Sequence, residues 1–307
     1  DVFAVTTYFT VSAVFFYLGT VPDLAAARDA AKGLRKKLYN VISLGWRGTD
    51  REWHHFGKAY IFLAALATPL VLSVHSVVSW DFAVAIVPGW HATIFAPYFV
   101  AGAIFSGIAM VITLTVPLRK VFGLEAYLTN KHYDAMAKLC LMTSLIVFYA
   151  YLSEFFMAWY SGEEVERAAF WARLFGPYWW ATWIMLVCNG MVPVMLWFKR
   201  VRYSIPALFT ISIFVNIGMW FERYVIIVTS LHHEYEPFAW GLYRPTIVEM
   251  SIVVGSFCWF GFWFLLFTRL LPPVAIAELK EVLPTPMRPR TSVGPSGPGA
   301  GGPGGER

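Results

Sequence analysis

Several ionisable side chains interrupt long apolar stretches of the sequence, where a charge is costly. The clearest cases are Glu154, Glu222, Arg223 and Glu249. In a membrane, an ionisable residue at such a position marks a pathway or a binding site by default. Glu154 has the weakest structural reason for its position, and we expect it to transfer protons. Together with Asp134, these residues are the candidates for a proton pathway.

Three of these residues also have a structural explanation. Glu249 begins its apolar stretch, where a carboxylate stabilises the start of a helix through the helix dipole. Glu222 and Arg223 are adjacent in sequence and can satisfy each other's charge. The sequence leaves the structural and the functional explanation open at these three positions.

A second group of candidate residues surrounds the end of another apolar stretch. His75, Trp80 and Asp81 lie near that end, and His91 precedes the next stretch. A histidine and a carboxylate beside a pocket open to lipid suit quinol oxidation, because a base must take the hydroxyl protons as electrons leave. We predict quinol binding by all four residues, with Asp81, His75 and His91 as the catalytic candidates. Capping of a helix end and binding of water would also explain His75 and Asp81.

The cysteines and histidines predict no metal or haem site. Cys140, Cys188 and Cys258 are far apart, lie in apolar stretches and form no CxxC pattern. A transmembrane cytochrome b needs paired histidines on facing helices, yet His75 is the only histidine well inside an apolar stretch. We therefore expect the chain to hold no metal and no redox cofactor of its own, so that electrons pass to cofactors of partner subunits.

The elements that position these residues are long apolar helices. Of the 307 residues, 58% are hydrophobic and 14% charged, which lies outside the usual composition of soluble domains. A bilayer core about 30 Å thick needs about 20 helical residues per span. Seven stretches qualify, and they predict an all-α, polytopic bundle of transmembrane helices. The stretches are Val2–Leu18, Ala59–Val78, Phe95–Val116, Ala135–Tyr160, Trp180–Trp197, Ala207–Val228 and Thr246–Leu271.

The distribution of Lys and Arg predicts how these spans are oriented. Basic residues are concentrated in alternate connections, above all in residues 19–58, whereas residues 79–94 contain none. Because basic connections face the cytoplasm, the first span should run inward and the C-terminus should be cytoplasmic. The candidate acid–base groups then lie mostly toward the outer face. In this setting a net charge of +5 reflects topology, and we expect no nucleic-acid partner.

The spans and connections divide the chain into three parts. Residues 1–78 form the first part, and residues 79–271 contain an outer loop and the remaining spans. Residues 272–307 form a Pro/Gly-rich tail that we expect in the cytoplasm. Apolar residues at helical spacing predict a helix over residues 22–38, either on the inner leaflet or as a solvated loop helix.

Two stretches of the sequence resemble a known family. Residues 76–111, which include the motifs WDF and PGWH, and the stretch GTVPDLAAARD at 19–29 are similar to the NrfD/PsrC-like membrane subunits of polysulfide-reductase-type complexes. Within that family, WDF and PGWH are most similar to the ActC subunit of alternative complex III, a bacterial quinol-oxidising complex. The sister subunit ActF shares the fold.

The resemblance implies a fold of about ten spans in two four-helix bundles with flanking helices. Residues 1–78 would then end the first helix bundle, and residues 79–271 would include the second four-helix bundle. This chain, which starts at Asp1 without a basic leader, would supply the last seven spans. It would carry no redox cofactor and would bind menaquinol or ubiquinol near the outer face of a bacterial inner membrane. Asp81 matches the acid of the family's quinol site, with His75 and His91 as weaker companions.

The resemblance also implies partners. Electrons would pass to an extrinsic periplasmic iron–sulfur subunit, and the complex would contain a homologous membrane subunit and c-type cytochromes with haems. Coupling to proton translocation is a further expectation. A secondary transporter or channel is an alternative, although no paired spans carry matched Gly/Pro breaks. A structural membrane anchor without a quinol site, like ActF, is another.

Overall fold

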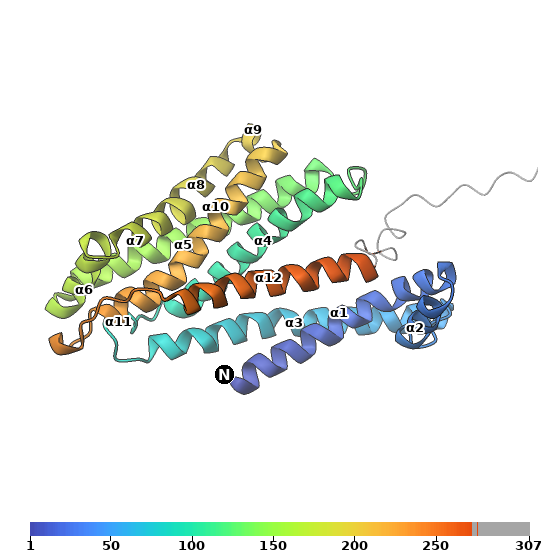
Figure 1. Cartoon of the computed structure of the whole chain (residues 1–307), viewed down its shortest axis with the longest axis horizontal. Coiled ribbons are helices and arrows are strands. Elements are labelled where there is room, and N and C mark those ends of the chain that lie inside the picture. Colours follow the sequence, from blue (N-terminus) through green and yellow to red (C-terminus); the bar gives the residue numbers. More distant parts are fainter. Residues whose placement is uncertain (272–274, 276–307) are drawn as a thin grey trace, which may run out of the picture. The chain divides into compact units, whose positions relative to one another are not determined.

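The computed structural model describes residues 1–271 and 275, and within this part the chain is helical with no strand (Figure 1). The predicted tail lies outside the described residues, apart from Ala275. The α-helices are α1 (Val2–Ala30), α2 (Leu34–Ile42), α3 (Asp50–Ala83), α4 (Phe95–Val121), α5 (Asn130–Ser161), α6 (Glu164–Phe175), α7 (Trp179–Leu186), α8 (Val192–Val194), α9 (Lys199–Arg202), α10 (Ile205–Tyr224), α11 (Ser230–His232) and α12 (Ile247–Leu270). Shorter segments are η1 (Val187–Met191), η2 (Met195–Trp197), η3 (Val225–Thr229) and η4 (Pro237–Ala239).

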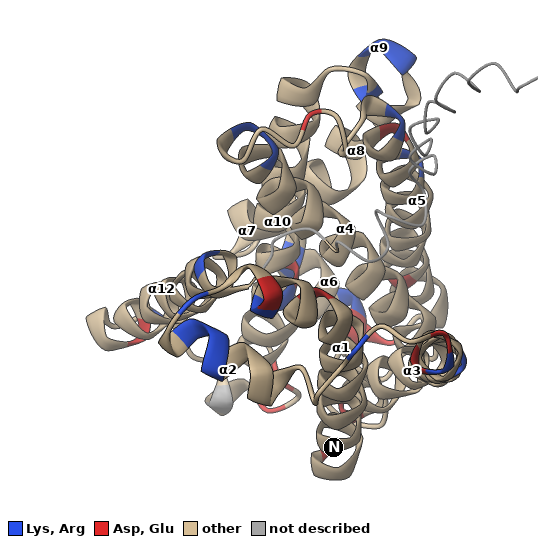
Figure 2. Cartoon of the chain, turned by 90° about the vertical axis from the view of Figure 1, so that its right-hand side faces the viewer, with Lys and Arg blue, Asp and Glu red and all other residues tan. Residues whose placement is uncertain are grey.

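Seven helical segments of the described chain are long and apolar enough to cross a membrane, which confirms the predicted all-α polytopic fold. They are α1, α3, α4, α5, α12, the run Trp179–Trp197 and the run Ile205–His232. Most extend beyond the predicted bounds, because helices continue into polar sequence outside the hydrocarbon. The run Trp179–Trp197 is followed by a separate basic turn, α9, which carries Lys199, Arg200 and Arg202 and is blue in Figure 2.

The chain forms two compact units. One contains Asp1–Phe16 and Gly57–Phe257, and the other contains Tyr17–Phe56 with the chain from Cys258 onward. The predicted boundary between residues 78 and 79 stays a prediction.

The expected helix over residues 22–38 is wrong. Instead, α1 continues through Pro22 to Ala30, and α2 begins at Leu34. Gly33 interrupts the helix with a φ of 65°, a conformation that glycine adopts without the steric cost paid by other residues.

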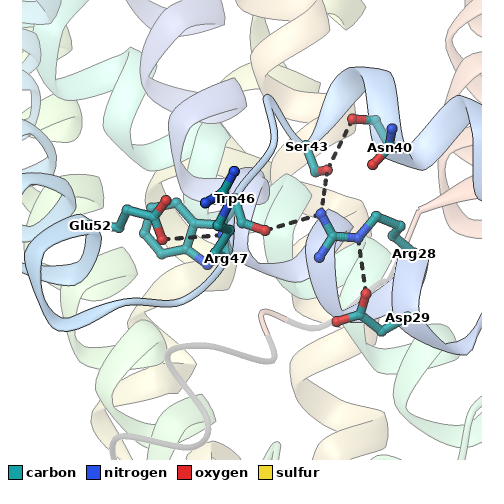
Figure 3. Close-up of polar contacts among 7 residues, drawn as sticks. All are labelled: Arg28, Asp29, Asn40, Ser43, Trp46, Arg47 and Glu52. Carbon is teal, nitrogen blue, oxygen red and sulfur yellow. Dashed lines mark hydrogen bonds and ion pairs between the residues drawn. The ribbon is translucent and has the colours of Figure 1, made fainter.

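In the second unit, hydrogen bonds from Arg28 link the end of α1 to the connection that follows α2 (Figure 3). Its Nη1 donates to the Trp46 carbonyl at 3.0 Å and to the Ser43 hydroxyl at 3.4 Å, while its Nε bonds Asp29 at 2.9 Å. This arginine belongs to the GTVPDLAAARD stretch. That stretch therefore has a structural role in shaping the connection.

The start of α3 is fixed by reciprocal capping. The Glu52 carboxylate accepts hydrogen bonds from the backbone N–H groups of Arg47 at 3.1 Å and Thr49 at 3.0 Å, and Figure 3 draws the first of these. The Thr49 hydroxyl in turn accepts one from the backbone of Glu52 at 3.3 Å. This capping box explains why α3 begins well before its apolar stretch.

A four-helix core forms in the first unit from α4, α5, α10 and the run Trp179–Trp197. Figure 1 shows α4, α5, α7 and α10 side by side, and contacts join α4 to α5, α4 to α10 and α7 to α10. The buried positions of α5 recur every three or four residues, as one helix face requires. They include Tyr133, Ala137, Cys140, Ser144, Val147, Tyr151, Glu154 and Ala158.

Two of the spans contain a π-helical segment, η1 and η3. Such segments often occur at functional sites, because they disturb the regular α-helical hydrogen bonds. In η1 the residues Cys188, Asn189 and Gly190 are buried. In η3 the carbonyl of Ile226 accepts a hydrogen bond from the Trp90 indole at 2.7 Å. Trp90 belongs to the PGWH motif, so this bond ties the loop before α4 to η3.

Glycine allows α10 to approach η1 closely. A Cβ added at Gly218 would overlap the Asn189 Oδ1 and would lie 2.7 Å from the Cys188 Cβ. We expect Gly218→Ala to destabilise the protein by about 1–3 kcal/mol, as overpacking does in a filled core. Thermal unfolding in detergent measures the effect. Gly107→Ala in α4 is the matched control, since no atom lies within 4 Å of the added Cβ. Equal melting of the two variants would contradict the prediction.

Candidate functional site

Polar and charged side chains meet inside the four-helix core. Tyr151 and Glu154 come from α5, Asn189 from η1 and Glu222 from α10. Glu222 and Asn189 are fully buried, Tyr151 is 2% exposed and Glu154 is 9% exposed. We call these four residues the buried acid cluster. The helical face of α5 positions Tyr151 and Glu154 one turn apart, so both point into the same interior.

Hydrogen bonds link three members of this cluster. The Tyr151 hydroxyl donates to Glu222 Oε2, and the Asn189 side-chain amide donates to the Tyr151 oxygen at 2.9 Å. Arg223 Nη2 lies 3.5 Å from the other carboxylate oxygen, and its guanidinium stacks over Phe99 at 4.2 Å. Glu222 therefore has a neutral donor on one side and a positive charge on the other.

Several polar atoms of the cluster have no hydrogen-bond partner within the described chain. They are Glu154 Oε1, Glu222 Oε1 and Asn189 Oδ1, together with Arg223 Nη1 beside them. A buried polar atom without a partner costs about 1–3 kcal/mol, so most such atoms in proteins bind water, an ion or a ligand. The gathering of four in one interior indicates a function other than packing.

Glu154 faces a buried arginine of α6. Arg173 is 4% exposed, and its Nη1 lies 3.9 Å from Glu154 Oε2. Its Nη2 donates to the Ser230 hydroxyl at 2.7 Å and to the Gly89 carbonyl at 3.4 Å. Burial lowers the pKa of the Arg173 guanidinium, and the Glu154 carboxylate opposes that shift. The arginine thus joins α5, the loop before α4 and the end of the α10 run.

A cavity of about 600 Å³ lies beside Glu154 at the predicted outer end of the bundle. Its apolar wall includes Tyr149, Phe156, Met157 and Phe170, and its polar wall includes His91, Glu154, Glu163 and Glu166. His91 and Glu163 are exposed while Glu154 is buried, so the cavity leads from the surface to the cluster.

Of the four residues predicted to bind quinol, His91 lines this cavity and the other three lie on α3. Trp80 is 53% exposed, and Asp81 is exposed in the last turn of the helix. His75 is partly buried, with Nδ1 2.8 Å from the Val71 carbonyl and its ring edge-on to Tyr8. Phe82, next to Asp81, packs against Trp90, next to His91, with ring centroids 4.8 Å apart.

Of the residues predicted for a proton pathway, Glu154, Glu222 and Arg223 lie in or beside the buried acid cluster. Asp134 lies elsewhere, at the start of α5, where it pairs with Lys138 at 2.5 Å and Arg202 at 2.8 Å. Arg202 also donates to the carbonyls of Leu196 and Trp197, both at 2.8 Å.

Glu249 fits the structural explanation given by its sequence position. Its carboxylate accepts hydrogen bonds from the backbone N–H of Thr246 at 2.6 Å and from the hydroxyl of the same residue at 2.8 Å. The backbone N–H of Glu249 donates to that hydroxyl at 3.3 Å. The side chain is partly buried and caps α12, which accounts for its charge without a proton pathway.

Sequence reasoning missed Tyr151, Arg173 and Glu166 in this region, and it assigned no role to Asn189. Tyr151 had a usable signal, because it precedes Glu154 by one helical turn and so shares its face. Asn189 was recognisable as a polar residue within a span. Arg173 and Glu166 gave no signal, since the sequence shows only charges in a connection between spans.

Comparisons with known proteins identify relatives of this chain. The family model described as polysulphide reductase, NrfD matches residues 1–233. The chain is also 26% identical over 265 residues to a candidate membrane subunit of dimethyl sulfoxide reductase from Halobacterium salinarum. That alignment covers 76% of this chain and 57% of the relative, so the chain spans little more than half of the relative's length.

Proposed function

Because the chain belongs to the polysulphide reductase NrfD family, we propose that it is the quinol-binding part of a membrane subunit in a respiratory oxidoreductase of the alternative complex III type. In this proposal a menaquinol or ubiquinol near the outer face becomes a quinone by losing two electrons and two protons. The electrons pass to an iron–sulfur cluster of an extrinsic partner subunit. The protons pass to bases of this chain and leave outward.

The observation that carries the proposal is the position of Asp81. It lies in the last turn of α3, where the helix dipole disfavours a negative charge. Within the described chain Asp81 has no hydrogen bond or ion pair from its carboxylate. No hydrogen bond or ion pair of the described chain occupies this carboxylate, so it can act as a base for a quinol hydroxyl. Trp80 beside it offers an exposed ring for stacking.

His75 supports Asp81 from the same helix. Its Nδ1 faces the Val71 carbonyl, which orients the ring and leaves Nε2 free for a ligand. The backbone contact fixes one tautomer, in which Nε2 is an acceptor for a hydroxyl proton. We assign His75 a positioning or proton-accepting role toward the same quinol.

The buried acid cluster supports the second part of the proposal, proton movement. Glu154 belongs both to the cluster and to the wall of the cavity that leads to the surface. Glu222, Tyr151 and Asn189 continue the hydrogen-bonded path into the core. We therefore place the outer half of a proton path at Glu154 and leave Glu249 outside it, as a helix cap.

Neutral polar side chains extend the path toward the other end of the bundle. The Asn216 amide donates to the Thr113 hydroxyl at 2.9 Å, which donates to the Ser212 hydroxyl at 2.9 Å. Ser212 and Asn216 precede Glu222 on α10, and Asp134 lies at the start of α5. We propose Asp134 as the inner end of the path, with the ion pairs to Lys138 and Arg202 holding it in place.

The direct test of the quinol site is Asp81→Asn. We expect quinol-dependent turnover of the assembled complex to fall by about 10²-fold, the usual effect of removing an acid–base group. Assembly with the partner subunits should stay unchanged, because the carboxylate makes no contact within the described chain. Asp50→Asn, at the exposed first turn of the same helix, is the matched control. If Asp81→Asn turned over normally and the native complex bound no quinone analogue at this chain, a structural anchor would be favoured instead.

A further inference from the structure

Three metal-binding side chains converge at the surface opening of the cavity. His91, Glu163 and Glu166 each offer one donor atom, and these atoms all lie within 4.8 Å of one another. His91 comes from the loop before α4, and the two glutamates come from the start of α6. Since His91 is far from the two glutamates in sequence, the spacing gave no metal signature, and the sequence predicted none.

The orientation of His91 places its Nε2 against a carboxylate oxygen, where a proton or a cation must lie between the two atoms. Its Nδ1 faces the Val87 carbonyl at 3.4 Å, the backbone contact that commonly orients a metal-binding histidine. Its Nε2 lies 2.7 Å from Glu166 Oε1. When Nδ1 carries the proton toward the carbonyl, Nε2 presents a lone pair to a carboxylate. Two acceptors at this distance need a proton or a metal cation between them.

Helix capping does not explain the two glutamates. The dipole favours carboxylates at the start of α6, yet no side chain there makes a capping hydrogen bond. Glu166 instead contacts the His91 imidazole, and a carboxylate oxygen of Glu163 lies within 4.8 Å of the donor atoms of both residues. The carboxylates are thus directed at a common point in front of His91.

Two features of the surroundings support a site here, a buried carboxylate inside the cavity and a loop that is held in place. Glu154, which lines the same cavity, is about nine-tenths buried and has one oxygen without a partner. The loop that carries His91 is held in place at Gly89, whose φ is 78°. A Cβ there would lie 2.7 Å from Arg173 Nη2, so only glycine fits this packing.

We propose that His91, Glu163 and Glu166 bind a divalent transition metal, with Zn²⁺ as the best match. One imidazole and two carboxylates are ligands that zinc accepts, at bonds of about 2.0–2.2 Å, and a fourth position remains for water. Small side-chain rotations bring the donors to those distances. Because the exposed ligands surround the opening and Glu154 lies inside, a bound ion would stand between Glu154 and the outer solution.

The test is Zn²⁺ binding to the purified complex, stripped with a chelator and titrated with the metal alone by calorimetry. We expect His91→Ala and Glu163→Gln each to weaken one binding event by at least about 10-fold relative to the native complex. Glu164→Gln removes a neighbouring charge of the same helix turn and should bind as the native complex does. Zinc that binds elsewhere in the complex is the same in all three variants, so differences among them report on this site alone.

X-ray absorption at the zinc edge gives a second measurement on the same samples. The site should show one imidazole and otherwise oxygen ligands, and that signal should disappear in His91→Ala. Unchanged affinity and stoichiometry in both ligand variants, or an imidazole-free spectrum, would overturn the proposal and leave a His91–Glu166 ion pair. Neither measurement uses turnover, so its result is separate from that of Asp81→Asn.

Discussion

Replacing Glu154 by glutamine is expected to lower the number of protons released per electron and to slow quinol-dependent turnover by about 10²-fold. Glutamine keeps the size of the side chain but cannot exchange a proton. Glu154 is the carboxylate that both borders the cavity and reaches the core, so its loss interrupts the path at its outer end. The measurement is the proton-to-electron ratio of the complex reconstituted in vesicles.

The control for Glu154→Gln is Glu125→Gln, an exposed residue in the connection after α4. It removes the same charge and should leave both quantities unchanged. A normal proton-to-electron ratio in Glu154→Gln would exclude this route for proton movement. Because quinol binding is assigned to Asp81, that result would leave the proposed oxidation site in place.

The second large effect is expected for Arg173→Leu. Removing the guanidinium leaves the Glu154 carboxylate buried without its positive partner and takes the donor from Ser230 and Gly89. Breaking a buried ion pair from one side costs about 3–5 kcal/mol. We therefore expect a markedly lower melting temperature of the complex in detergent and weaker retention of this chain in it.

A double variant separates the charge from the packing. In Arg173→Leu/Glu154→Gln the unpaired carboxylate is gone, so part of the lost stability should return. Arg167→Leu, an exposed arginine of the same helix, should melt as the native protein does. If the double variant were less stable than Arg173→Leu, the ion pair would not be the source of the effect.

The seven spans could be predicted from the sequence because the requirement for them is local. Each must contain about 20 apolar residues in succession, and no distant contact changes that count. The first and last residues of each helix were harder to predict, as α3 shows. The helix begins at Asp50 because Thr49 and Glu52 cap it. Those two residues lie in polar sequence, where hydropathy gives no signal for a helix start.

The site was only partly predictable, because charge in a stretch of sequence does not show which charges meet. Glu154 and Glu222 stood out by their cost in a membrane, and the structure brings both into one core. Arg173 belongs to a connection with several charges, and only the fold reveals that it is buried beside Glu154. Asp134 was predicted for the proton pathway as another acid near a span, yet its ion-pair partner Arg202 lies at the end of the bundle.

The hydrogen bond from Trp90 to Ile226 gives the loop before α4 a fixed point on a π-helical segment. That segment follows Glu222 and Arg223 directly along the same span. Trp90 precedes His91 in the chain, so the same hydrogen bond holds the backbone beside the surface imidazole against the span that carries Glu222. One bond between main chain and indole therefore positions the loop relative to the interior carboxylate.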